Sequence, residues 1–355
     1  MQKVTVCASN GDYFVHIGKG LLSKLGTIAK DSAKGNKVML VSDTNVFPLW
    51  GEMAKSSLKD AGYEVYTFVF ESGEQSKTPE TLIEILNSLA ENNLHRDDII
   101  VALGGGVTGD MAGLAAALYL RGIGYISVPT TLLAAVDSSV GGKTAVDLKS
   151  GKNLCGAFWQ PKAVVCDTHT LSTLTDDIFA CGMAEVIKYG MIDSKELFDE
   201  ICENNIRKCP EDAIKKCVEI KARIVNEDEF DNGIRAILNF GHTLGHSVEK
   251  LSDFSIPHGE AVAIGMSAVT LACERQGICS EGTHKSLINA LKTYSLPYTS
   301  PFSLEDVCEH CGGDKKMSGK GLSLIIAEKI GNAKIHVIPF ENLTEFMEDA
   351  REVFA

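Results

Sequence analysis

The chain has 355 residues, 45% hydrophobic and 23% charged, with a formal net charge of −13. These values are typical of a globular protein with a large core and two domains, and the negative charge argues against nucleic acid or an anionic membrane as a partner. Eleven scattered cysteines, together with no signal-peptide pattern and no apolar run of bilayer length, predict a cytoplasmic location.

The first half of the chain predicts strands that alternate with helices. Val4–Ala8 and Tyr13–Ile17 flank Asn10-Gly11, which is a hairpin signal. Thr78 caps a helix that begins with Pro79 and continues to about Asn93. Further strands are expected at residues 37–42, 64–70, 98–103, 125–128 and 163–167. This alternation predicts a Rossmann-like parallel sheet covered on both faces, in an N-terminal α/β domain of residues 1–170.

The second half predicts mainly helices. They are expected at residues 176–191, 195–207, 211–229, 234–250, 260–276 and 284–294. One late hairpin-like pair of strands follows, at residues 322–327 and 334–338. We therefore expect a mainly α-helical domain at residues 171–355.

A glycine-rich segment, Gly104–Gly109, matches G-x-G-x-x-G directly after a predicted strand and at the start of a helix. Such a turn lets a pyrophosphate approach the backbone and the helix N-terminus. The match is not on the first strand–helix unit, and no acidic residue ends a strand about 20 residues later. Asp43, which ends an earlier strand, is the better candidate for a ribose diol, and Asp110 is either a ligand contact or a favourable dipole charge. A tight turn without a ligand is the alternative.

Other polar loops are expected at the same edge of the sheet. Glu74 and Lys77 lie in E-S-G-E-Q-S-K, and Thr130-Thr131 follow a strand. Lys143 and Lys152 lie in segments rich in glycine, a setting that favours anion contacts over solvated side chains. Open α/β sheets bind ligands beyond the carboxyl ends of their strands.

A polar stripe is predicted on the helix at residues 234–250. Arg235, Asn239, His242 and His246 share one face if the helix is continuous. The stripe carries no Glu or Lys and is flanked by the small residues Gly241, Thr243, Gly245 and Ser247, so it is expected to line a cavity rather than meet bulk solvent. Two histidines four residues apart can bind one metal or one substrate.

Further ligand candidates occur on largely uncharged helices. Glu185 and Lys188 are three residues apart, a spacing that also fits a simple intrahelical ion pair. His258 begins another helix after a proline. A Glu/His/His set with an open position is a usual catalytic zinc arrangement. Spacing alone favours His242 and His246 as the histidine pair, with His258 left over.

The chain resembles the 3-dehydroquinate synthase family, within the sugar-phosphate cyclases, over essentially its whole length. The motifs that carry the resemblance are S-D-T-N (42–45), S-G-E-Q-S-K (72–77), L-G-G-G-V-T-G-D (103–110), V-P-T-T-L-L (128–133), V-D-S-S-V-G-G-K-T (136–144), G-K-N (151–153), G-M-A-E-V-I-K-Y-G (182–190), L-N-F-G-H-T-L-G-H (238–246), H-G-E (258–260) and D-K-K (314–316).

The resemblance changes the metal assignment that spacing favours. It implies that Glu185, His242 and His258 bind one divalent ion, zinc or cobalt, and that His246 faces the substrate. It implies further substrate contacts at Asp137, Lys143, Asn153, Lys188, Lys221, Arg235, Asn239 and one of Lys315 or Lys316.

The resemblance also implies a dinucleotide site and a dimer. It places NAD contacts in the segments that contain Asp43, Asn45, Ser72, Gly73, Glu74, Gln75, Ser76, Lys77, Gly105, Gly106, Val107, Thr108, Gly109, Asp110, Thr130, Thr131, Lys143, Lys152, Thr170, Leu171, Ser172 and Thr173. Arg121, in Y-L-R-G, matches an arginine that reaches the phosphate of the neighbouring subunit's substrate, which implies a homodimer.

The family reaction converts 3-deoxy-D-arabino-heptulosonate 7-phosphate to 3-dehydroquinate and phosphate in the shikimate pathway. It proceeds by transient NAD-dependent oxidation at C5, β-elimination of phosphate, re-reduction, ring opening and intramolecular aldol closure. NAD is regenerated, so the expected enzyme is a lyase. The alternatives are another sugar-phosphate cyclase, a metal-dependent polyol or glycerol dehydrogenase, and a non-catalytic NAD-binding regulator.

Overall fold

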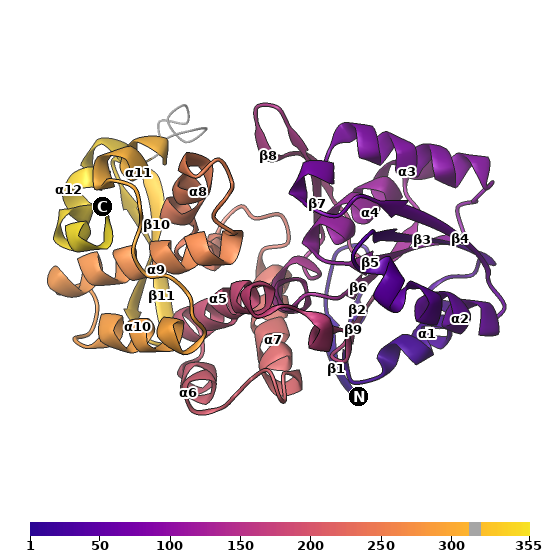
Figure 1. The fold of residues 1–355 in the computed structure, drawn as a ribbon, viewed down its shortest axis with the longest axis horizontal. Helices are drawn as coiled ribbons and strands as arrows, with labels where there is room; N and C mark the ends of the chain where they lie inside the picture. Colours follow the sequence, from indigo (N-terminus) through magenta and orange to yellow (C-terminus); the bar gives the residue numbers. More distant parts are fainter. Residues whose placement is uncertain (312–320) are drawn as a thin grey trace. The chain divides into compact units, whose positions relative to one another are not determined.

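The computed structural model describes residues 1–311 and 321–355 (Figure 1). These residues form two compact units, Met1–Thr175 with Pro210–Phe230, and Asp176–Cys209 with Asp231–Ala355. Residues 210–230 therefore group with the first unit, whereas the division expected from the sequence placed them in the second domain. The predicted substrate contacts Lys315 and Lys316 lie outside the described residues.

The first unit is built on a seven-stranded sheet in the order β1-β2-β9-β6-β5-β3-β4. All its neighbouring strands pair in parallel except β1 and β2, which form the predicted antiparallel hairpin. The strands are β1 (Gln2–Val6), β2 (Tyr13–Gly18), β3 (Lys37–Asp43), β4 (Glu64–Phe70), β5 (Ile99–Gly104), β6 (Gly124–Pro129) and β9 (Ala163–Asp167). The predicted parallel α/β architecture is thus confirmed.

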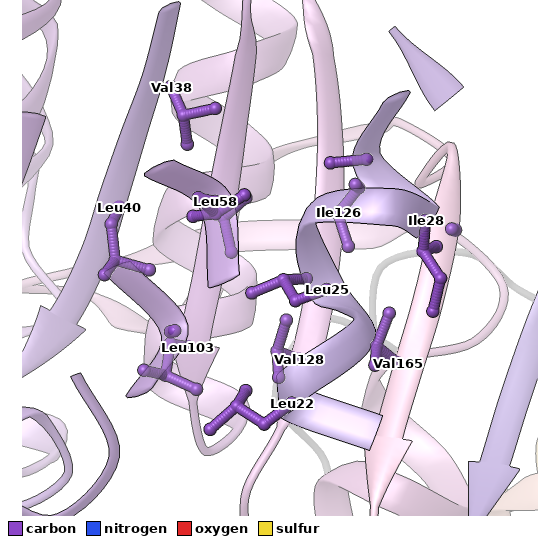
Figure 2. Packing of buried hydrophobic residues seen from close by; sticks show 14 of the residues in the cluster. Leu22, Leu25, Ile28, Val38, Leu40, Leu58, Leu103, Ile126, Val128 and Val165 are labelled. Carbon is purple, nitrogen blue, oxygen red and sulfur yellow. The ribbon is translucent and has the colours of Figure 1, made fainter. Parts of the chain in front are cut away.

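Alternating side chains of the strands build a core on each face of this sheet. On β3, Val38 and Leu40 pack with residues of α1 and α2, whereas Met39 and Val41 belong to the cluster with α3 and α4. Figure 2 shows the first cluster, in which leucines from the helices lie against the strand side chains. The helices are α1 (Leu25–Ser32), α2 (Glu52–Asp60), α3 (Pro79–Glu91) and α4 (Gly106–Leu118). Strands buried on both faces are typical of a doubly wound sheet.

The strand order identifies the point of the sheet where a ligand is expected to bind. Strand β3 lies between β4 and β5, so the chain moves outward from β3 to β4 and then crosses over to β5 on the other side. At such a switch point the loops after the two central strands diverge and leave room for a ligand. Asp43 ends β3 and Gly104 ends β5, so both lie at this position.

Two features of the first unit differ from the sequence-based expectation. Lys143 and Lys152, expected in glycine-rich loops, lie instead in an antiparallel hairpin of β7 (Lys143–Leu148) and β8 (Gly151–Phe158). Its second strand is mostly exposed and lacks an apolar pattern, so the sequence gives little sign of it. Helix α7 (Glu211–Glu227) is the other addition, because it packs against β1 and β2 of this unit.

The second unit is mainly helical, as predicted, and contains the expected late hairpin. Its α-helices are α5 (Asp176–Ile192), α6 (Lys195–Glu203), α8 (His242–Leu251), α9 (His258–Arg275), α10 (Thr283–Thr293), α11 (Leu304–His310) and α12 (Leu343–Met347). Strands β10 (Leu322–Lys329) and β11 (Asn332–Ile338) pair antiparallel. Helix α9 packs against both α5 and α8. Across the described residues, no helix combines the length and the apolar character that crossing a membrane requires.

The helix predicted at residues 234–250 is broken in the structure. Ile234–Asn239 form a 3-10 helix (η7), and α8 begins only at His242. Gly241 between them has a left-handed φ of 80°, and a Cβ there would lie 2.5 Å from the Cγ of Met266. The prediction of one continuous polar stripe is therefore wrong, because helical periodicity does not pass through residue 241.

Candidate metal centre and nucleotide-binding turn

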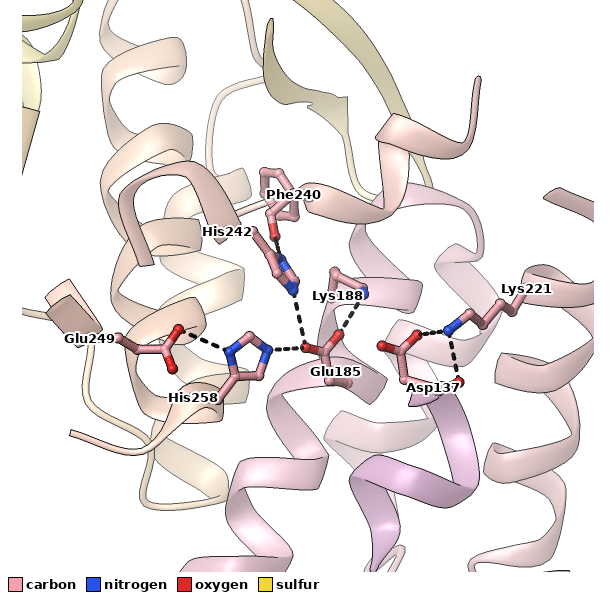
Figure 3. Close-up of polar contacts among 8 residues, drawn as sticks. All are labelled: Asp137, Glu185, Lys188, Lys221, Phe240, His242, Glu249 and His258. Carbon is pink, nitrogen blue, oxygen red and sulfur yellow. Dashed lines mark hydrogen bonds and ion pairs between the residues drawn. The ribbon is translucent and has the colours of Figure 1, made fainter. Parts of the chain in front are cut away.

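Three side chains from three helices of the second unit converge on one point. Glu185 lies in the middle of α5, whereas His242 and His258 are the first residues of α8 and α9. The Oε1 of Glu185 lies 3.5 Å from the Nε2 of His242 and 3.3 Å from the Nε2 of His258 (Figure 3). All three ligand atoms lie within 4.8 Å of one another. The cluster is therefore a candidate metal centre.

The outer nitrogen of each histidine faces an acceptor. The Nδ1 of His242 lies 3.1 Å from the carbonyl oxygen of Phe240, and the Nδ1 of His258 lies 3.1 Å from the Oε2 of Glu249. A carbonyl or an ionised carboxylate only accepts hydrogen bonds, so each Nδ1 carries a proton and donates it. Each Nε2 then faces Glu185, which is the side on which a metal would bind.

The Glu185 carboxylate is fully buried next to a cation. Its Oε2 lies 2.5 Å from the Nζ of Lys188, which is itself buried. Burial opposes ionisation of this carboxyl group, but its interactions with Lys188 and His242 outweigh it and lower its pKa well below the usual range. Glu185 is thus held as a carboxylate, the form that binds a metal.

The charge on His258 also depends on its neighbours. Burial lowers the pKa of His258, but hydrogen bonds to Glu185 and Glu249 outweigh it and raise this pKa to about 10. As the side chains stand, the imidazole is therefore protonated on both nitrogens at neutral pH. A metal ion that binds here would displace the Nε2 proton.

The donor set fits a divalent ion in a tetrahedral site. Bonds of about 2.0–2.2 Å to zinc separate neighbouring ligand atoms by about 3.3–3.6 Å in a tetrahedron, and the two Oε1–Nε2 distances, 3.3 and 3.5 Å, match that spacing. Both carboxylate oxygens of Glu185 are buried, and apart from their ion pairs with Lys188 and the two histidines they have no hydrogen-bond donor among the described residues. Buried oxygens of this kind are satisfied by a cation.

The remaining residues of the predicted stripe lie outside this set of three ligands and differ in exposure. The His246 ring is exposed, and its centroid lies 5.4 Å from that of His242 and 5.9 Å from that of His258. Asn239 is exposed and Arg235 is buried. The structure thus brings His258, and not His246, together with Glu185 and His242, contrary to the pair that spacing favoured.

The glycine turn of the first unit leaves its backbone accessible. The turn follows β5, and α4 begins at Gly106. A small pocket next to it is lined by, among others, Gly105, Asp110, Ser138 and Lys143. A Cβ added to Gly105 would lie 3.2 Å from the Cγ2 of Thr131, so little space is left for any side chain there. A turn that exposes backbone N–H groups at a helix N-terminus is suited to a pyrophosphate.

Asp43 is held by its own surroundings in this structure. Its Oδ1 accepts hydrogen bonds from the backbone N–H groups of Asn45 and Val46, at 2.9 and 3.0 Å, and its Oδ2 accepts one from the Thr108 hydroxyl at 3.2 Å. The side chain is also buried. Asp43 therefore shapes the loop after β3 and connects it to α4, and its predicted contact with a ribose diol stays a prediction.

Lys77 connects two parts of the first unit. Its buried Nζ lies 2.6 Å from the Oδ2 of Asp110, on α4, and 2.5 Å from the Oδ1 of Asn153, in the β7–β8 hairpin. Burial opposes the charge on Lys77, but Asp110 and Glu74 outweigh it and raise its pKa. Asn153 itself has a left-handed φ of 57°. Lys77 thus contacts both Asn153, a predicted substrate residue, and Asp110, a predicted NAD residue.

Three more predicted substrate or phosphate contacts also lie in the first unit. The Nζ of Lys221, on α7, lies 2.7 Å from both the carbonyl oxygen and the Oδ1 of Asp137 (Figure 3). Arg121 is exposed in a turn where it and Leu120 have left-handed φ values of 67° and 50°. Such backbone strain in residues other than glycine is often found at functional sites.

The other predicted NAD contacts follow the carboxyl ends of strands. They belong to loops or short helices after β3, β4, β5, β6 and β9, and comprise Asn45, Ser72, Gly73, Glu74, Gln75, Ser76, Gly106, Val107, Gly109, Thr130, Thr170, Leu171, Ser172 and Thr173. Lys152 instead lies on β8, and its Nζ is 3.6 Å from the Oε1 of Glu74. Almost all of the predicted NAD contacts thus lie at the carboxyl edge of the sheet.

Two groups at the metal centre were missed by the sequence analysis. The carbonyl of Phe240 carries no sequence signal, because any residue provides one. Glu249 does carry a sequence signal, because it lies seven residues after His242 and therefore on the same face of α8 as His242.

Comparison with known proteins gives concordant results. Residues 67–181 match the family described as 3-dehydroquinate synthase N-terminal, and residues 182–317 match 3-dehydroquinate synthase C-terminal. A 3-dehydroquinate synthase from Clostridium acetobutylicum is 43% identical over 353 residues, which cover 98% of this chain and 99% of that protein.

Solved structures of other cyclases share the fold. A 2-deoxy-scyllo-inosose synthase complexed with carbaglucose-6-phosphate, NAD+ and Co2+ superposes with a TM-score of 0.88 at 26% identity, covering 98% of this chain and 99% of that one. The 2-epi-5-epi-valiolone synthase of Streptomyces hygroscopicus, with NAD+ and Zn2+ bound, has a TM-score of 0.87 at 24% identity, covering 98% of each chain.

Proposed function

This chain belongs to the 3-dehydroquinate synthase family, and we propose that it converts 3-deoxy-D-arabino-heptulosonate 7-phosphate to 3-dehydroquinate and phosphate. The observation that carries the proposal is the convergence of Glu185, His242 and His258 in a chain that matches the family along nearly its whole length. The reaction is a net phosphate elimination, so the enzyme is a lyase of the shikimate pathway. It depends on NAD and one divalent metal, zinc or cobalt.

The second unit would hold the metal through Glu185, His242 and His258. A divalent ion in this position acts as a Lewis acid and lowers the pKa of a substrate hydroxyl group. With Oε2 of Glu185 paired to Lys188, Oε1 is the oxygen that faces the two histidines. His246 is exposed beside them, which supports a role in moving protons to and from the substrate.

Basic residues would bind the phosphate and carboxylate ends of the substrate. The Lys188 ammonium has three donors, so it can keep its contact with Glu185 and still donate to a phosphate oxygen. We assign Lys143 to the same phosphate, together with an Arg121 from the neighbouring subunit. We assign Lys221, Arg235, Asn153 and Asn239 to orientation of the rest of the substrate, with Asp137 holding Lys221. Locally gathered cations explain how a chain of charge −13 attracts an anion.

The first unit would hold NAD at the switch point of its sheet. The cofactor supplies a hydride acceptor that is restored within each turnover. The glycine turn at Gly104–Gly106 supports pyrophosphate binding through backbone N–H groups. The ion pair between Lys77 and Asp110 would stabilise this site.

We also propose that the enzyme works as a homodimer in which Arg121 completes the partner's site. The strained turn at Leu120 and Arg121, next to the exposed Leu118, supports this assignment. Mixing Arg121→Ala subunits with His242→Ala subunits tests it. Heterodimers should regain activity, because the first subunit keeps its metal ligands and receives Arg121 from the second. Failure to regain activity in proven heterodimers would contradict the exchange.

A cytoplasmic location is part of the same proposal. The eleven cysteines are scattered through the chain and are not spaced as a disulfide framework, which supports a reducing compartment. Five of them are buried, so they contribute to the core rather than to cross-links.

One assay separates this function from its alternatives. Purified enzyme with NAD and Co2+ or Zn2+ is given the heptulosonate phosphate, and released phosphate is measured while NADH absorbance is monitored. We expect phosphate release without net NADH. A dehydrogenase would accumulate NADH and release no phosphate, and another cyclase would act on a different sugar phosphate. Either result would contradict the proposal.

A further inference from the structure

Glu249 is a buried acidic residue next to the metal centre that the proposed mechanism does not use. It lies near the end of α8 and is only 4% exposed. Its Oε2 is 3.1 Å from the Nδ1 of His258 (Figure 3). Burying an ionised carboxylate costs free energy unless it is paired, so a carboxylate retained at this position calls for an explanation.

The backbone of Glu249 holds the loop that leads to the same histidine. Its carbonyl oxygen accepts hydrogen bonds from the Ser252 hydroxyl and the Phe254 N–H, both at 2.8 Å. The Ser252 hydroxyl oxygen in turn accepts the Ile256 N–H at 3.1 Å. These residues form the loop that leads to His258. The side chain and the backbone of Glu249 therefore both act on the entry to α9.

The two histidines of the centre differ in a way that explains why one has a charged partner. His242 is 11% exposed and donates to a neutral carbonyl, whereas His258 is 34% exposed and faces the carboxylate of Glu249. A more exposed imidazole is freer to rotate and to bond to water. A charge-assisted hydrogen bond is about twice as strong as a neutral one, so it restrains that ring more firmly.

We propose that Glu249 is a positioning residue for the metal, which it affects through His258. Its carboxylate accepts a hydrogen bond from the Nδ1–H group, fixes the ring orientation and so directs the Nε2 atom toward the point between the ligands where the ion would lie. It also makes the imidazole a stronger donor to the ion. The inference rests on the proposed metal site and adds a residue outside the three ligands.

A competing arrangement uses the same atoms. His246, Glu249 and His258 also have ligand atoms within 4.8 Å of one another. If Glu249 were itself a ligand of a second ion, its carboxylate would bind that ion instead of the His258 proton. The hydrogen bond seen between Glu249 and His258 favours the positioning role, and metal stoichiometry distinguishes the two.

Co2+ affinity of the full-length protein, measured by competition with a chelator, tests the proposal without an activity assay. Glu249→Gln keeps the size and an acceptor oxygen but removes the charge. We expect one ion per chain in both proteins, with affinity about 10- to 100-fold weaker in the variant. The Co2+ absorption bands should also shift, because the field of the His258 ligand changes. Glu249→Asp, which keeps the charge, should weaken binding less and serves if the first variant does not fold.

A matched control is available on α9. Glu274 accepts the backbone N–H of His284 at 2.7 Å, and Glu274→Gln should leave Co2+ affinity unchanged. If folded Glu249→Gln keeps the wild-type Co2+ affinity and Co2+ absorption bands, the positioning role of Glu249 is overturned, whereas the metal site of the proposed function is not. Two Co2+ ions bound per wild-type chain would overturn the positioning role as well, because Glu249 would then be a ligand. A wild-type chain that binds no Co2+ would refute the metal site of the proposed function and this inference with it.

Discussion

The glycine turn of the first unit and the ligand cluster of the second are built in opposite ways. The turn uses consecutive residues after β5, and its chemistry lies in backbone N–H groups that glycine leaves accessible. The cluster uses side chains from α5, α8 and α9, which are distant in the sequence and meet only through helix packing.

This difference determines what each site tolerates. A backbone site should be insensitive to the loss of most side chains and sensitive to the addition of a single Cβ atom. A side-chain site should be abolished by removing one ligand and weakened by changes in the packing that orients it. The following predictions test this contrast, from the largest expected effect to the smallest.

Loss of a ligand should have the largest effect. His242→Ala removes one of the three metal ligands. Removing a residue that only orients a ligand weakens metal binding by up to about 100-fold, so this variant should lose more than that. Turnover should disappear together with the metal. Metal content after dialysis and phosphate release measure the two effects. A variant that is fully active without bound metal would refute the assignment of this centre.

Lys77→Met should be the most damaging change in the first unit. It leaves Asp110 without its cation, and breaking a buried ion pair costs about 3–5 kcal/mol. The free energy of unfolding from urea titration measures this loss. Adding Asp110→Asn should recover part of it, since no charge is then left unpaired. Equal stability of the single and double variants would show that the pair is not what stabilises this region.

Gly241→Ala should weaken the side-chain site through the backbone. An alanine at φ 80° is strained, and its Cβ would lie 2.5 Å from the Met266 Cγ and 2.7 Å from the Val262 carbonyl oxygen. We expect a loss of about 2–3 kcal/mol in stability and weaker Co2+ binding, because His242 is the next residue. Wild-type Co2+ affinity in the Gly241→Ala variant would mean that the start of α8 does not depend on residue 241.

Gly105→Ala should act on NAD and little on the fold. Its φ of −78° suits any residue, and the added Cβ would meet only the Cγ2 of Thr131, at 3.2 Å. We expect NAD affinity to fall about tenfold, or about 1.4 kcal/mol, with stability changed by less than that. Isothermal titration with NAD gives the affinity. Wild-type affinity in this variant would count against a pyrophosphate on the turn.

Gly109→Ala is the control for the preceding variant and should have the smallest effect. Residue 109 lies within α4, and a Cβ there would meet no atom within 4 Å. Alanine in a helix interior is favoured over glycine by about 0.5–1 kcal/mol, so the melting temperature should rise slightly. A lower melting temperature would show that the space around this position is not open.

Local signals account for what could be predicted correctly. The parallel sheet follows from alternating strands and helices, and the start of α3 follows from Thr78, whose hydroxyl accepts the Thr81 N–H at 3.2 Å. The glycine turn was recognisable because its chemistry lies in adjacent residues. The family resemblance added His258 to the metal set, which spacing along one helix did not do.

The sequence by itself therefore determined the class of fold, the turn after β5 and the residue types available for catalysis, because these depend on interactions between near neighbours. Only the tertiary structure decided the break at Gly241, the inclusion of α7 in the first unit and the contact of Glu249 with His258. Each of these depends on close packing between distant segments, such as α8 against α9, and side-chain periodicity along one segment carries no record of that packing.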